Sequence, residues 1–101
     1  MRIAIYQVRF DESGRDYAFR SYDDIVRDFG NLNRGVYDKV YDFDVESSTE
    51  ISLDDLYEIF NLHRPDDFKG HSMSVSDVVE TPDGFWFCDS FGWKKIDWEK
   101  E

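Results

Sequence analysis

The segment from Ser72 to Trp98, SMSVSDVVETPDGFWFCDSFGWKKIDW, decides the fold. At its centre, Thr81-Pro82-Asp83-Gly84 has the composition of a tight turn, because proline presets φ and Asp-Gly tolerates unusual backbone angles. The runs on either side of this turn are β-branched and aromatic, as half-buried strands prefer. A second turn is expected at 89–92. The segment therefore predicts a β-meander.

The strand after the first turn is apolar on both faces. Phe85, Phe87 and Phe91 share one parity, and Trp86 and Cys88 share the other. Since successive side chains of a strand point to opposite faces, we expect this strand to lie centrally in the sheet, covered on both sides. The last strand, 93–98, contains three charged residues, which favour an edge position because they discourage pairing with other chains.

Upstream of the meander, the pattern predicts two more strands and two helices. Alternation of apolar residues predicts strands over 3–10 and 36–46. The first helix follows Ser21, a plausible N-cap, and ends at Gly30, where a C-terminal cap belongs. Its apolar stripe consists of Tyr22, Ile25, Val26 and Phe29.

A second helix is predicted from Leu53 to His63. Ser52 is its N-cap, with Asp55 three residues later, and Pro65 ends it. Together these elements predict an α+β fold: an antiparallel sheet of about four to five strands, with two helices packed on one face. A chain of 101 residues is the size of one domain, here residues 1–101.

Composition narrows the class of protein. No apolar run approaches the roughly 20 residues that cross a bilayer, and the N-terminus lacks a signal region. A lone cysteine, Cys88, fits a reducing compartment. We therefore expect a cytoplasmic protein that does not contact membranes.

The formal net charge is −11, and it is concentrated in the middle of the chain. Counting Lys and Arg against Asp and Glu gives zero for residues 1–34, −8 for residues 35–67 and −3 for residues 68–101. Such a chain is not expected to bind nucleic acid directly, but it is attracted to basic surfaces that normally hold nucleic acid. Acidity that only keeps a small protein soluble is the simpler alternative, but it predicts no such concentration.

The acidic residues of the strand at 36–46 alternate with apolar ones. Tyr37, Tyr41, Phe43 and Val45 fall on one face, interrupted by Lys39, and the acidic side chains fall on the other. Carboxylates two residues apart on a strand are about 7 Å apart, roughly the spacing of successive phosphates in a polynucleotide. The predicted partner-binding residues are Asp38, Asp42, Asp44, Glu46, Asp54, Asp55, Glu58, Asp66 and Asp67.

Catalytic signatures are missing from the sequence. The glycines are isolated, so no phosphate-binding loop is present, and Asp89-Ser90 lacks the glycines of a nucleophile elbow. His63, His71 and an aspartate could bind a metal, but their spacing matches no zinc signature. Cys88, among aromatic residues, is interpreted as a small buried hydrophobe. We expect a non-catalytic protein without cofactor or metal.

Part of the sequence resembles a known family. Phe60-Asn61, the run RPDDFKGHSMSVSDVV at 64–79 and CDSFGW at 88–93 are similar to the YodL-like domain. The similarity covers roughly residues 56–98, and residues 1–55 resemble no family that we can name. The resemblance implies a setting in bacterial conjugative elements and phages, often near antirestriction genes. The family offers no established catalytic residues to transfer.

This setting and the acidic middle segment together suggest a counter-defence protein. The expected activity is inhibition of a host defence nuclease by a nucleic-acid mimic that occupies its basic nucleic-acid-binding surface. The most specific form is an anti-CRISPR protein against a type II RNA-guided effector nuclease, which holds its heteroduplex in a positively charged channel. Two alternatives stay open: a protein-interaction adaptor in conjugation or plasmid maintenance, and an enzyme acting on guide RNA or DNA.

Overall fold

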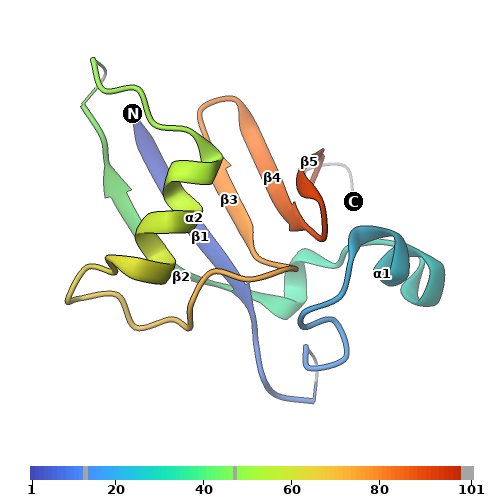
Figure 1. Cartoon of the computed structure of the whole chain (residues 1–101). Helices are drawn as coiled ribbons and strands as arrows, with labels where there is room; N and C mark the ends of the chain where they lie inside the picture. Colours follow the sequence, from blue (N-terminus) through green and yellow to red (C-terminus); the bar gives the residue numbers. More distant parts are fainter. Residues whose placement is uncertain (13, 47, 99–101) are drawn as a thin grey trace.

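The computed structural model describes residues 1–12, 14–46 and 48–98. In chain order, its elements are β1 (Arg2–Val8), α1 (Tyr22–Phe29), the 3-10 helix η1 (Arg34–Val36), β2 (Tyr37–Asp44), α2 (Leu53–Leu62), β3 (Val78–Thr81), β4 (Gly84–Asp89) and β5 (Gly92–Ile96). The strands form one antiparallel sheet in the order β2-β1-β3-β4-β5 (Figure 1). The predicted α+β fold, with an antiparallel sheet and two helices, is confirmed.

The predicted meander is confirmed from β3 to β5. Gly84 and Gly92 have φ values of 136° and 89°, which explains the glycines at the two turns. β5 lies at the edge of the sheet, as its charged residues predicted. Two details differ from the prediction: the segment 72–77 forms a loop and turn before β3, and Phe91 is fully exposed at the tip of the second turn.

The two helices cover opposite faces of the sheet, which corrects the prediction that both pack on one face. Ile25 of α1 belongs to a buried cluster with residues of even parity on β1. Leu56 and Phe60 of α2 belong to a second cluster with Ile3 and Ile5 of β1. β1 is buried on both faces, so each face needs its own cover. In Figure 1, α2 crosses in front of β1, and α1 lies beside the turn between β4 and β5.

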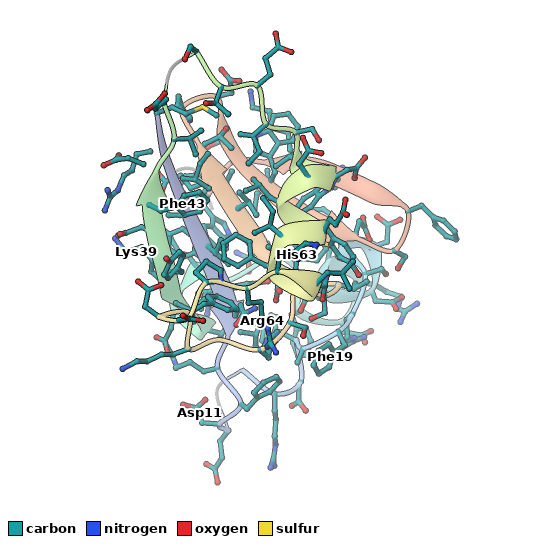
Figure 2. The ribbon with its side chains drawn as sticks, turned by 60° about the vertical axis from the view of Figure 1, so that its left-hand side comes forward. Asp11, Phe19, Lys39, Phe43, His63 and Arg64 are labelled. Atoms are coloured by element: carbon teal, nitrogen blue, oxygen red, sulfur yellow. The ribbon has the colours of Figure 1, made fainter. Side chains whose placement is uncertain are left out.

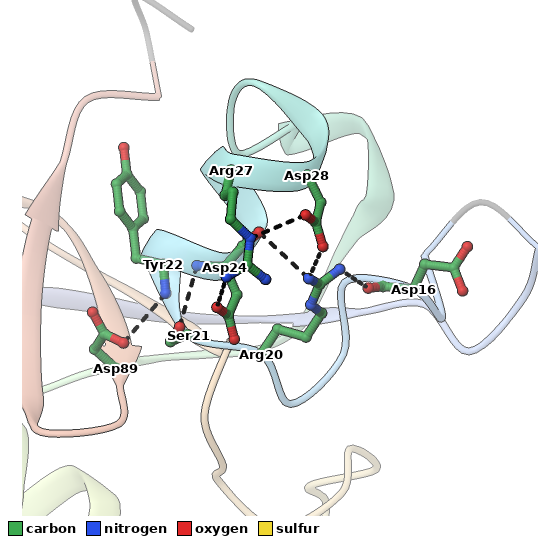
Figure 3. A network of polar contacts seen from close by, with 8 residues as sticks. All are labelled: Asp16, Arg20, Ser21, Tyr22, Asp24, Arg27, Asp28 and Asp89. Atoms are coloured by element: carbon green, nitrogen blue, oxygen red, sulfur yellow. Dashed lines mark hydrogen bonds and ion pairs between the residues drawn. The ribbon is translucent and has the colours of Figure 1, made fainter.

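The α1 helix is held at its ends as well as by packing. Ser21 caps it by accepting a hydrogen bond from the Asp24 backbone at 3.2 Å, and the Tyr22 backbone N–H donates to Asp89 of the meander at 3.3 Å. Arg20 reaches along the helix to Asp28 (Figure 3). Only Ile25 of this helix is fully buried, so these polar contacts fix a helix with a narrow apolar face.

The start of α2 is specified locally. Ser52 accepts from the Asp55 backbone N–H at 3.0 Å, and the Asp55 carboxylate accepts from the Ser52 backbone N–H at 2.9 Å. This confirms Ser52 as the N-cap, and the two hydrogen bonds with Asp55 form a capping box. His63 is the C-cap, one residue beyond the helix, so the predicted end is one residue late.

Candidate partner-binding surface

A β-bulge interrupts β2 in the middle of its acidic stretch. Ile5 of β1 pairs with Tyr41, but the next residue, Tyr6, pairs with Lys39. Val40 is therefore an extra residue in the pairing. An extra residue shifts the alternation of side chains by one position on either side of it. Simple alternation over residues 36–46 therefore predicts the wrong face for the side chains of half of the strand.

The bulge places the acidic residues of β2 on two faces. Tyr37 packs in the α1-side cluster. Phe43, which is labelled in Figure 2, packs on the α2 side. Asp38 pairs with a β1 residue whose side chain lies on the α2 side, and Asp42 and Asp44 pair with residues of the opposite parity. The predicted single row of carboxylates along this strand does not form.

Arginines of β1 and of the segment after it neutralise these strand carboxylates. Arg2 donates to Asp42 at 2.5 Å and to Asp44 at 2.9 Å. Arg9 donates to Asp38 at 3.1 Å. Because these pairs lie at the surface, they add little to stability. They do mean that the three predicted residues of β2 present paired charges to a partner.

The remaining predicted carboxylates are not engaged by cations. Within the described residues, six of the nine predicted positions form no salt bridge: Glu46, Asp54, Asp55, Glu58, Asp66 and Asp67. We call the five of them on α2 and the loop after it, Asp54, Asp55, Glu58, Asp66 and Asp67, the acidic surface.

Neutral hydrogen bonds hold part of the acidic surface in place. Asp54 accepts from the Trp93 indole N–H at 3.2 Å, and Asp67 accepts from the Tyr41 hydroxyl at 2.8 Å. Hydrogen bonds from Ser52 lower the pKa of Asp55 below its usual value, so this carboxylate stays ionised. These contacts fix the side chains while leaving their negative charge available.

A second surface lies beyond the C-terminal end of β1. It was not predicted from the sequence. Phe10, expected at the end of the first strand, lies beyond β1 and is 58% exposed, as is Phe19. Their rings stack with centroids 5.7 Å apart, and the ring centroid of His71 lies 5.2 Å from that of Phe10. Phe19 is labelled in Figure 2. Phe19 has a φ of 63°, which is unfavourable for an aromatic residue. We call these three side chains the aromatic patch.

Residues 70–77, which belong to the run that resembles the YodL-like domain, hold the aromatic patch in place through hydrogen bonds. Gln7 of β1 donates to the His71 carbonyl at 2.8 Å and accepts from the His71 backbone N–H at 3.1 Å. A Cβ on Gly70 would lie 2.4 Å from the Gln7 side-chain oxygen, so a larger residue there would displace this side chain. Ser76 accepts from the Phe19 backbone at 3.0 Å. The sequence contained one sign of this arrangement: Gln7 is polar, although it shares a face of β1 with Ile3 and Ile5.

A buried carboxylic acid with a strongly raised pKa lies next to His71. Asp77 is 1% exposed, and burial raises the pKa of its carboxyl group to about 8. One oxygen accepts from Gln7 at 3.0 Å and from the Ser74 backbone at 2.9 Å. The other has no hydrogen-bond partner and lies 3.9 Å from Nε2 of His71. Asp77 is thus enclosed in protein and is not part of the exposed acidic surface.

Of the residues considered for metal binding or catalysis, His71 has hydrogen-bonding or charged groups at both ring nitrogens, and Cys88 is buried. Nδ1 of His71 lies 2.7 Å from the Ser72 carbonyl, so it carries the proton, and Nε2 faces Asp77. Cys88 is buried, and burial raises the pKa of its thiol to about 12. In the described part of the chain, no group of three or more His, Cys, Asp or Glu residues is arranged to hold a metal ion.

Comparison with known proteins assigns the family. A family model described as "YodL-like domain" matches residues 2–98. The chain belongs to this family. The match extends the resemblance from 56–98 to nearly the whole chain, so β1, α1 and β2 are also part of the YodL-like domain. Neither the curated proteins nor the solved structures contain a match. Among the described residues, no helix has the length and apolar character needed to cross a membrane.

Proposed function

We propose that this YodL-like domain is a non-catalytic, cytoplasmic inhibitor encoded by a mobile genetic element. Its partner is a host defence nuclease, and the best candidate is a type II RNA-guided effector. The domain binds the basic surface on which that nuclease holds nucleic acid. Such a surface offers rows of Lys and Arg, which a rigid anionic protein can engage in place of phosphates.

The observation that carries the proposal is the acidic surface. Among the residues that the structure describes, its five carboxylates have no cation partner, whereas Asp38, Asp42 and Asp44 of β2 are paired with arginines. The binding energy is therefore expected to come from α2 and the loop after it, and the β2 carboxylates contribute less. Charge complementarity of this kind accelerates association at low ionic strength.

The test replaces two acidic residues whose side chains make no hydrogen bond or salt bridge in the described structure. Glu58→Lys combined with Asp66→Lys is expected to weaken binding to a guide-loaded type II effector at least tenfold and to relieve inhibition of DNA cleavage. The control, Glu12→Lys with Asp16→Lys, makes the same change in net charge at other exposed positions and is expected to retain most binding. Equal loss in both variants would mean that net charge acts without a defined surface. Tight binding that survives the Glu58/Asp66 change would exclude the acidic surface.

A second candidate, an adaptor in conjugation or plasmid maintenance, is favoured by the aromatic patch. Phe10 and Phe19 expose apolar area that a protein partner could cover. The two functions differ in their response to salt. Binding through the acidic surface weakens strongly between low and moderate ionic strength, whereas binding through an apolar interface changes little.

A further inference from the structure

Three aromatic rings gather around that of Trp98 on the α1 side of the sheet. Tyr6 of β1 lies edge-on to Trp98, with ring centroids 5.4 Å apart and an interplanar angle of 90°. Tyr37 of β2 and Phe85 of β4 lie 4.9 Å and 5.2 Å from Trp98, also at steep angles. Rings inclined in this way meet edge to face instead of stacking in parallel.

The Arg34 side chain lies over three of these four rings. Its guanidinium carbon lies 5.7 Å from the centroid of Tyr6, 5.0 Å from Phe85 and 5.4 Å from Trp98. The arginine is exposed, whereas the three rings are only 3–8% exposed, so they lie beneath it. Within the described residues, Arg34 forms no salt bridge, although the chain has 23 acidic residues.

The surroundings of the rings favour positive charge. Glu80 of β3 accepts a hydrogen bond from the Tyr6 hydroxyl at 2.9 Å, which places a carboxylate beside the rings. Burial, together with this carboxylate, raises the pKa of Tyr6, so its hydroxyl stays neutral. Several ring faces converging on one cation are the arrangement by which proteins recognise quaternary ammonium and methylated lysine groups.

We propose that Tyr6, Phe85 and Trp98 form a recognition site for an organic cation, and that Arg34 is its internal occupant. The ligand is a guanidinium or methylated ammonium group, such as a basic side chain of a protein partner. Arg34 is the first residue of η1, a single 3-10 turn, and its side chain leaves the rings when a competing cation replaces it. This site is independent of the proposed function, because the acidic surface belongs to α2 on the opposite face of the sheet.

The test empties the site and offers a simple cation. Wild type and Arg34→Ala are titrated with tetramethylammonium chloride, with sodium chloride at the same ionic strength as reference. The indole N–H resonance of Trp98 reports binding, and those of Trp86 and Trp93 serve as internal references. Arg34→Ala is expected to bind tetramethylammonium at least tenfold more tightly than wild type, and Arg34→Lys is expected to restore the block.

A matched control removes a cation from a single ring. Lys95 lies 5.5 Å from the centroid of Trp86 alone, so Lys95→Ala is expected to gain no affinity for tetramethylammonium. If Arg34→Ala does not give a folded circular-dichroism spectrum, Arg34→Gln replaces it. The proposal is overturned if the folded Arg34 variant binds no better than wild type, or if Lys95→Ala gains as much. It is also overturned if sodium shifts the Trp98 resonance equally.

Discussion

Asp77 is a carboxylic acid that the fold removes almost completely from solvent. Its carboxyl group is 1% exposed, with one oxygen in two hydrogen bonds and the other without a partner. Burial raises its pKa from 3.8 to about 8. Between these two values, the unfolded chain has lost the proton while the folded chain keeps it. Stability from this residue is therefore fully present below about pH 4 and falls as the pH rises toward 8.

The Asp77→Asn variant is expected to remove this dependence. Asparagine keeps an oxygen that accepts from Gln7 and Ser74 but cannot ionise. The free energy of unfolding of wild type should therefore decrease relative to that of Asp77→Asn as the pH rises from 5 to 8, by at most about 1.4 kcal/mol per pH unit. Urea unfolding at several pH values measures the difference. Glu58→Gln, at an exposed position, is the control, and its free energy of unfolding is expected to change with pH as that of wild type does. If Asp77→Asn also followed wild type at every pH, the raised pKa of Asp77 would be contradicted.

Among the secondary-structure elements, α2 has the most locally determined start. Ser52→Ala removes the hydroxyl that accepts from the Asp55 backbone, and this loss is expected to lower the free energy of unfolding by about 1 kcal/mol. Ser90→Ala, at an exposed turn position whose side chain makes no hydrogen bond in the described structure, is expected to change it far less. Urea denaturation of both variants compares them, and equal effects would show that the capping hydroxyl contributes nothing specific.

The caps were predictable from sequence because their partners lie three or four residues apart. Ser21, Gly30, Ser52 and Asp55 were all placed correctly, and so were the turns of the meander. The bulge at Val40 was not predictable, because it depends on how β2 pairs with β1, more than thirty residues away. That single extra residue separated the predicted row of carboxylates, which is why the fold was predicted better than the candidate site.

Assignment of the helices to faces also depends on the whole molecule. A helix stripe shows that one side is apolar, but it does not show which face of the sheet receives it. The deciding feature is β1, which is apolar on both parities and so needs a helix on each side. The same reasoning explains the missed role of Gln7: its partners, at 71 and 77, come from a loop far along the chain.

Since the sheet separates two clusters, truncations on its two faces are expected to act independently. Ile25→Val on the α1 side and Ile3→Val on the α2 side should each cost about 0.5–1.5 kcal/mol. The double variant should cost their sum within about 0.5 kcal/mol. Yet β1 and β3 contribute to both clusters, so the domain should still unfold as one unit, with coincident transitions in tryptophan fluorescence and far-UV circular dichroism. Non-additive energies would mean that the clusters share packing through the sheet, and separate transitions would mean that the two faces unfold independently.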